Sequence, residues 1–220
     1  MELFRTLAKI SVVLCLVVVV LGAWVRLTDA GLGCPDWPGC YGEMVVPNDP
    51  GADDAWPERP LETGKAWREM IHRYAAGMLG FIILALAVTA WIRRDRPGQP
   101  VILPTVVLGL VIFQALLGMW TVTLLLKPLV VTAHLAGGMT TLALLFWLAR
   151  QPARPAQPPE PRLRPFALFG LIVLAIQFLL GAWVSTNYAA LACPDFPTCQ
   201  NSFWPPMDFA AGFDPWHGLG

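Results

Sequence analysis

The chain has 220 residues, of which 56% are hydrophobic and 14% are charged, and its mean hydropathy is +0.57. A soluble domain usually carries about 25% charged residues. This chain has too few charged residues to cover a globular surface in water, which excludes a soluble globular protein. The net charge is zero and no basic cluster is interleaved with aromatics, which gives no sign of a nucleic-acid partner. The composition therefore indicates an integral membrane protein.

Five apolar stretches are each long enough to cross a bilayer, for which a helix needs roughly 20 residues. The first exceeds the apolar core of a typical signal peptide, so we interpret it as a retained anchor. We expect an all-α integral membrane protein, with a four-helix transmembrane bundle followed by the first helix of a second, pseudo-symmetric bundle. The predicted spans are Leu7–Leu27, Ile71–Ile92, Val101–Thr123, Leu129–Ala149 and Pro165–Ser185.

The charges between the spans predict the orientation of the chain. Lysine and arginine gather before the first span, after the second, and between the fourth and fifth. The loop from Thr28 to Glu69 is instead rich in acids. The positive-inside rule then predicts a multi-pass protein of the cell (inner) membrane, with a cytoplasmic N-terminus and extracytoplasmic cysteine-containing loops.

An internal repeat relates the first span to the fifth. Residues 22–40 and 181–199 align without a gap at an offset of 159 residues and are identical at 11 of 19 positions. Duplicated helical units of parallel topology are a known membrane architecture, and the second unit would by this logic need about three further spans. We therefore expect an N-terminal membrane unit at 1–150, a Pro-rich cytoplasmic linker at 151–164, and the start of a second membrane unit at 165–220.

Two histidines are predicted to lie at similar depth near the extracytoplasmic side. His72 falls in the first turn of the second span and His134 about five residues into the fourth. A haem iron held between helices by two axial histidines needs this arrangement. The alternative, a polar residue satisfied at a helix end, stays open at this point.

A glutamate and two arginines accompany the histidine pair. Glu69 precedes His72 by three residues and shares its helix face. It is expected to stay hydrated and relay protons, or else to be an acid that favours a helix N-terminus. Arg26 and Arg73 lie at the outer ends of the first two spans, where they would hold carboxylates such as haem propionates or extend to the interface.

Four cysteines form two pairs of identical spacing. Cys34 and Cys40, like Cys193 and Cys199, enclose two prolines and lie in predicted extracytoplasmic loops, where disulfides persist. We expect a disulfide within each pair. Cys34–Cys40 is either a structural link or a redox-active bond, whereas Cys193–Cys199 is expected to be structural.

Together these segments resemble the haem A synthase family across essentially the whole chain. The matching pieces are GAWVRLTDAGLGCPDWPGC, EMIHR, QALLGMWTV, AHL, GAWV with CPDFPTC, and FWPPMDFAAG. The resemblance implies eight spans in two pseudo-symmetric four-helix halves. It also implies an oxidoreductase that oxidises a methyl group of haem O to the formyl group of haem A for terminal oxidase biogenesis.

The resemblance also implies roles for individual residues. His72 and His134 would be axial ligands of the substrate haem in the N-terminal half, Glu69 the catalytic carboxylate, and Cys34–Cys40 the functional disulfide. The C-terminal half would hold a haem b cofactor, whose ligands are expected in spans that this sequence does not include. Haem O and membrane lipids are the expected partners, and haem O synthase, an electron donor and a second copy of the chain are further candidates.

Two other functions compete with this interpretation. A quinone-coupled membrane thiol–disulfide oxidoreductase would use the outer cysteine pairs, but neither pair is CxxC and the histidine pair would have no role. A non-catalytic haem-binding protein of electron transfer or oxidase assembly would use the histidines without converting haem O.

Overall fold

The structure is a computed structural model that describes residues 2–48, 51–150 and 161–215. Most of the predicted linker at 151–164 and the last five residues of the predicted second unit therefore lie outside the described residues. At the end of the linker, Pro161–Leu163 forms the short 3-10 helix η1.

Five long helices make up the described chain, and each is long and apolar enough to cross a membrane. Within the described residues no strand is present, so the predicted all-α fold is confirmed and the chain is a multi-pass membrane protein. Two short helices, η2 (Ala189–Leu191) and α6 (Phe209–Gly212), follow the last span. The long helices are α1 (Glu2–Leu27), α2 (Thr63–Ile92), α3 (Ile102–Thr123), α4 (Pro128–Ala149) and α5 (Arg164–Thr186).

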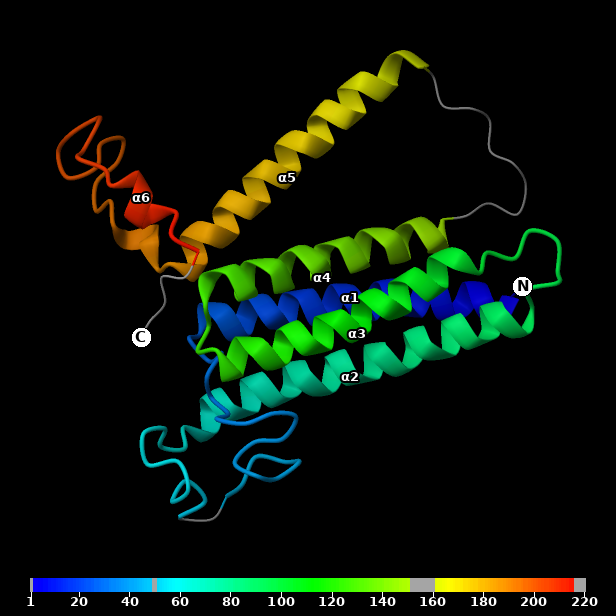
Figure 1. Cartoon of the computed structure of the whole chain (residues 1–220), viewed down its shortest axis with the longest axis horizontal. Helices are drawn as coiled ribbons and strands as arrows, with labels where there is room; N and C mark the ends of the chain where they lie inside the picture. Colours follow the sequence, from blue (N-terminus) through cyan, green and yellow to red (C-terminus); the bar gives the residue numbers. More distant parts are fainter. Residues whose placement is uncertain (1, 49–50, 151–160, 216–220) are drawn as a thin grey trace.

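The first four helices form a bundle (Figure 1). Helix α1 packs against α2 and α4, and α3 packs against the same two helices. Successive helices run in opposite directions, so α1 and α3 end where α2 and α4 begin. We call this the loop end of the bundle. The interior is apolar because the buried side chains recur at helical spacing, as Leu79, Ile83, Leu86 and Ala90 do in α2.

Helix α2 begins eight residues earlier than predicted, at Thr63 rather than Ile71. Its 30 residues extend about 45 Å, more than the roughly 30 Å of hydrocarbon in a bilayer. The added turns are polar in sequence, yet Ala66 and Met70 are buried against the loop between α1 and α2. As a result His72 lies in the third turn of the helix and not, as predicted, in the first.

The loops that follow α1 and α5 share a local structure. The Cys34–Cys40 and Cys193–Cys199 disulfides are both present. An aspartate in each ring accepts hydrogen bonds from the two backbone amides five and six residues further along the chain. The first loop is packed on α2 with both cysteines fully buried, whereas Cys193 is exposed. The aspartates and amides are Asp36 with Tyr41 and Gly42, and Asp195 with Gln200 and Asn201.

Helix α5 diverges from the bundle and approaches it near the start of α4 (Figure 1). There the Arg26 guanidinium donates to the carbonyl of Ser185 and lies 4.0 Å from the ring centroid of Tyr188. The Tyr188 hydroxyl hydrogen-bonds a carboxylate oxygen of Asp29 at 3.1 Å. Both hydrogen-bonded pairs join residues 159 apart, which is the offset of the sequence repeat. Equivalent positions thus contact each other, as residues beside a twofold axis do.

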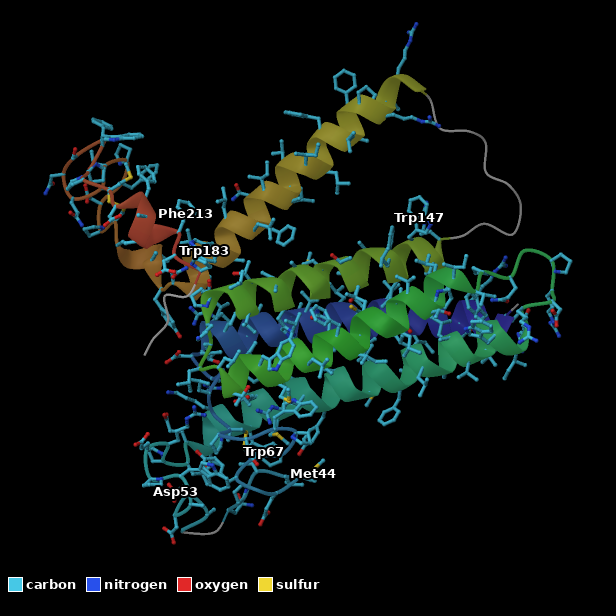
Figure 2. The ribbon with its side chains drawn as sticks, viewed as in Figure 1. Met44, Asp53, Trp67, Trp147, Trp183 and Phe213 are labelled. Carbon is cyan, nitrogen blue, oxygen red and sulfur yellow. A yellow bond between two sulfur atoms is a disulfide. The ribbon has the colours of Figure 1, made fainter. Side chains whose placement is uncertain are left out.

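The second loop folds back onto the end of α5 (Figure 2). The rings of Trp183 and Phe213 stack with centroids 6.4 Å apart, and the Trp183 indole donates to the carbonyl of Gly212 at 2.8 Å. Asp208 caps α6 by accepting from the amide of Ala211. These contacts bring α6 back to the helix that the loop leaves.

Candidate functional site

His72 and His134 project into the bundle from α2 and α4 near its loop end. The two imidazoles are close enough to interact electrostatically. The Nδ1 atom of each ring is buried and has no hydrogen-bond partner within the described chain. A buried polar atom without a partner costs free energy, and such atoms in native structures commonly mark a ligand or a functional site.

Gly22 of α1 packs directly against the His72 ring. A Cβ atom added to Gly22 would lie 3.1 Å from Cε1 of His72, so the ring rests against bare helix backbone. The ring also lies near the backbone of Val18, one turn before the glycine. Its Nδ1 atom has no hydrogen-bond partner among the described residues and is left for a ligand.

The His134 ring is held in the same way by α3. A Cβ atom added to Gly118 would lie 3.5 Å from Cε1 of His134, and the ring lies near the backbone of Gln114. The side chain of Gln114 lies in turn against Gly137 of α4, and its Nε2 atom is buried without a partner among the described residues. In both α3 and α4, a polar side chain thus packs against a glycine of the other helix.

Glu69 is buried beneath the first loop, with 5% of its surface exposed. Its Oε2 atom accepts from the backbone amide of Cys34 at 2.9 Å, and its Oε1 atom pairs with Nη2 of Arg73 at 2.5 Å. The prediction that this carboxylate stays hydrated is wrong, because the loop covers it. The alternative of an acid at a helix N-terminus also fails, since Glu69 lies beyond the first turn of α2.

Arg73 ties the disulfide loop to α2. Its Nη1 atom donates to the carbonyls of Asp36 at 2.9 Å, Pro38 at 3.3 Å and Gly39 at 2.5 Å, while Nη2 binds Glu69. The guanidinium therefore already has a carboxylate and three carbonyl partners. Arg26 likewise binds protein, through the contacts with the start of the second loop described above.

A hydrogen-bonded tyrosine braces the rest of the first loop, which lies beyond the N-terminus of α2 around Asp53 (Figure 2). The Tyr41 hydroxyl donates to the carbonyls of Arg59 at 3.0 Å and Pro60 at 3.2 Å. Burial, reinforced by the negative charge of Asp53, raises the pKa of Tyr41 above its ordinary value. The hydroxyl consequently keeps the proton that it donates. Trp56 packs edge-on against the Tyr41 ring at 5.5 Å.

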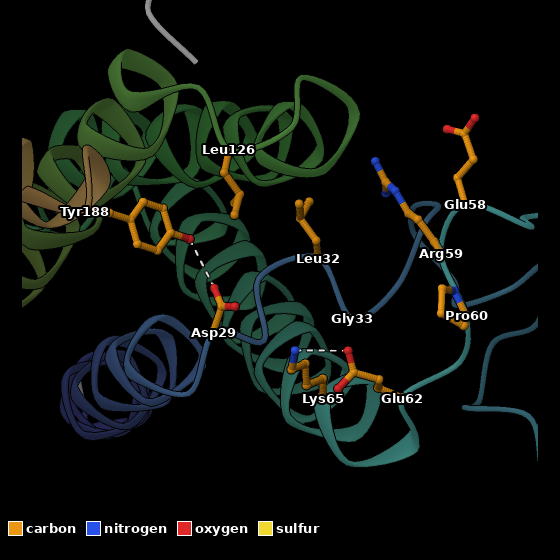
Figure 3. A pocket seen from close by; sticks show the side chains of 10 residues that line it. All are labelled: Asp29, Leu32, Gly33, Glu58, Arg59, Pro60, Glu62, Lys65, Leu126 and Tyr188. Carbon is orange, nitrogen blue, oxygen red and sulfur yellow. Dashed lines mark hydrogen bonds and ion pairs between the residues drawn. The ribbon is translucent and has the colours of Figure 1, made fainter. Parts of the chain in front are cut away.

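A cavity of about 560 Å³ opens between the first loop, the α3–α4 turn and Tyr188 (Figure 3). The hydrogen bond from Tyr188 to Asp29 and the 3.0 Å ion pair of Lys65 with Glu62 lie on its walls. Neither His72 nor His134 lines it. Acidic and basic side chains both line the cavity, so its electrostatics select neither anions nor cations. Its lining residues are Asp29, Leu32, Gly33, Glu58, Arg59, Pro60, Glu62, Lys65, Leu126 and Tyr188.

Comparison with known proteins decides the family. The family model described as cytochrome oxidase assembly protein, COX15-CtaA, matches residues 5–219. The chain belongs to this family. The resemblance to haem A synthases that the motifs indicate is therefore confirmed.

Several relatives in this family carry the name heme A synthase. The protein of Shewanella oneidensis is 43% identical over 96% of this chain and 66% of its own length. That of Halalkalibacterium halodurans is 30% identical over 94% of this chain and 66% of its own. That of Shouchella clausii is 31% identical over 88% of this chain and 62% of its own. The chain thus spans slightly less than two thirds of the length of these relatives.

Proposed function

We propose that the chain is the substrate-binding part of a haem A synthase, an oxidoreductase that oxidises a methyl group of haem O to the formyl group of haem A. The relatives named heme A synthase support this proposal. The observation that carries it is the pair of half-buried histidines, whose Nδ1 atoms are each buried and have no hydrogen-bond partner within the described residues. Haem O is the proposed substrate, and haem O synthase and an electron donor are the proposed partners.

The histidine pair fits a haem iron. The Nδ1 atoms of His72 and His134 are buried and have no hydrogen-bond partner among the described residues, so each ring has a nitrogen that could bind the iron. The two imidazoles would hold the iron of a bound haem from α2 and α4. When bound, the substrate haem would supply the methyl group that is oxidised.

Glu69 is the proposed proton acceptor. Conversion of a methyl to a formyl group adds an oxygen atom and, with water as its source, releases protons and electrons. A carboxylate one turn from His72 can receive one of these protons. The Cys34 amide and Arg73 hold its two oxygens in place. Burial of both Cys34 and Cys40 favours a positioning role for this disulfide over exchange with external thiols, and so weighs against the thiol–disulfide oxidoreductase.

We assign haem b to the second membrane unit, which begins with α5. Gly181 of α5 occupies the repeat position of Gly22, which packs against the His72 ring. By this equivalence, a histidine ligand of the second unit would lie beside Gly181.

In the proposed orientation, the loop end lies on the extracytoplasmic side of the cell (inner) membrane. The basic residues Arg93, Arg94 and Arg96 lie at the opposite end, directly after α2. A membrane-impermeant thiol reagent applied to intact cells after reduction should label Cys193, the most exposed cysteine of the described loops. Labelling that needs a permeabilised inner membrane would reverse the orientation.

The function is tested by separating haem binding from conversion. His72→Ala and His134→Ala should each lose the low-spin haem spectrum of this unit, because an axial ligand is gone. Glu69→Gln keeps the size of the side chain and should retain haem while haem O conversion is lost. If Glu69→Gln converted haem O at the unmutated rate, the proposed catalytic role of Glu69 would be wrong. Bound haem without any conversion in the unmutated protein would favour the non-catalytic assembly function.

A further inference from the structure

The basic side chains at the loop end differ in the partners that their charged groups already have. Arg73 pairs with Glu69, and Lys65 pairs with Glu62. Arg26 donates to a backbone carbonyl and covers the ring of Tyr188. Like Arg59, it has no carboxylate partner within the described residues, and each of the two has one buried nitrogen without a partner there. Arg68 has no carboxylate partner in the described part of the chain, and its recorded contact is with the ring of Trp24, whose centroid is 5.8 Å from Cζ.

The position of Arg68 on α2 is tied to that of His72. The two residues are four apart, so they share a helix face, with Arg68 about 6 Å closer to the loop end. Side chains in a helix also tilt toward its N-terminus, which carries the guanidinium further in that direction. Arg68 therefore lies above the imidazole, on the side of the site that faces the loops.

The chemistry of a haem dictates which of its edges faces that side. Its two propionates are ionised carboxylates, which are costly to place in hydrocarbon. A haem held by His72 and His134 therefore turns this edge toward the loop end, where the polar turns of α2 begin. A guanidinium is suited to a carboxylate there because it donates two parallel hydrogen bonds.

We propose that Arg68 binds a propionate of the substrate haem and fixes its orientation between the two histidines. The inference rests on the proposed function and adds a ligand-binding residue to it. Arg68 replaces Arg73 in this role, since the donors of Arg73 hold the first loop and Glu69. Arg26 instead donates to the carbonyl of Ser185 and covers the ring of Tyr188. A cation–π contact near the 6 Å limit is weak, so the guanidinium can leave Trp24 for a carboxylate at little cost.

Titration with two haems tests the inference. Purified protein in detergent is titrated with iron protoporphyrin IX and with its dimethyl ester, in which both propionates are uncharged. The readout is the low-spin signal that His72→Ala abolishes. Arg68→Gln should weaken binding of the free acid about tenfold, the equivalent of one charge-assisted contact, and leave binding of the ester unchanged. Arg68→Lys should recover part of the loss, and Arg94→Gln, at the opposite end of α2, should bind like the unmutated protein.

The possible outcomes separate this inference from the function on which it rests. Equal weakening for both haems would show that Arg68 supports the fold, and no weakening for either would show that it is not used; both results overturn the inference alone. A protein with no His72-dependent haem signal would overturn the proposed function and the inference with it. Should Arg68→Gln fail to accumulate, the unmutated protein should still bind the ester about tenfold more weakly than the acid, and equal binding would overturn the inference.

Discussion

The side-chain amide of Gln114 in α3 occupies the space that a Cβ atom at Gly137 in α4 would fill, with Nε2 only 1.7 Å from that position. The two helices therefore pack as closely as they do because residue 137 has no side chain. The same contact lies one turn from His134, so the packing of α3 on α4 is coupled to the position of a proposed haem ligand.

This contact predicts the effect of a single methyl group. Gly137→Ala should destabilise the protein by about 1–3 kcal/mol, because the methyl overlaps the amide and displaces it. Combining it with Gln114→Ala should restore most of the loss by emptying the space. Unfolding in mixed detergent micelles provides the measurement, with Gly138→Ala as the control because nothing lies within 4 Å of a Cβ there. Equal effects at Gly137 and Gly138 would contradict the prediction.

The glycine beside His72 should control the haem spectrum. A methyl at Gly22 would lie 3.1 Å from the imidazole, so Gly22→Ala must shift the ring by a few tenths of an ångström. We expect a weaker low-spin signal at a given haem concentration, measured by optical titration. Gly77→Ala in α2 meets nothing within 4 Å and should leave the titration unaltered. A Gly22→Ala protein that titrates like the unmutated one would show that the ring position is not decisive.

The two disulfides should be reduced at different rates. Cys34–Cys40 is fully buried and Cys193 is exposed, so a water-soluble thiol should reduce Cys193–Cys199 first. Arg73→Gln removes donors from three loop carbonyls and should speed reduction of Cys34–Cys40 about tenfold, as if loop opening became easier by about 1.4 kcal/mol. Timed alkylation and peptide mass mapping would follow both bonds. A parallel acceleration of Cys193–Cys199 would mean that the whole fold, and not the loop, had loosened.

The contact between Asp29 and Tyr188 should contribute a small but measurable coupling energy. Tyr188→Phe removes the hydroxyl while keeping an aromatic ring under Arg26. In a double-mutant cycle with Asp29→Asn, we expect a coupling of about 0.5–1 kcal/mol in the free energy of unfolding, as for one partly exposed hydrogen bond. Additive effects of the two substitutions would show that the hydroxyl and the carboxylate do not interact in solution.

Hydropathy was sufficient to find every span but not every helix boundary. The helices α3, α4 and α5 begin within one residue of the predicted starts, because each start coincides with the onset of an apolar run. The first turns of α2 escaped prediction because their sequence, TGKAWREM, is polar and becomes helical where it packs under a distant loop. Burial of Glu69 followed from the same loop and could not be read from its neighbours.

The candidate site was only partly predictable. His72 and His134 could be paired from their depth alone, since both follow from the position of a span. The carbonyl partners of Arg26 and Arg73 could not be predicted, because residues far away in the sequence supply them. The role proposed for Arg68 has a signal in the sequence, its spacing of four residues from His72, but Arg73 lies nearer to that histidine.

The contacts at an offset of 159 residues also limit which units can pair. On a true twofold axis Asp29 would face a second aspartate and Arg26 a second arginine, and in each case like charges would repel. With Ser185 and Tyr188 in the equivalent positions, the first unit instead meets a neutral carbonyl, a ring face and a hydroxyl. Because the second unit has different residues at these two positions, pairing of the first unit with another copy of itself is disfavoured. Pairing with the second unit of the same chain is favoured.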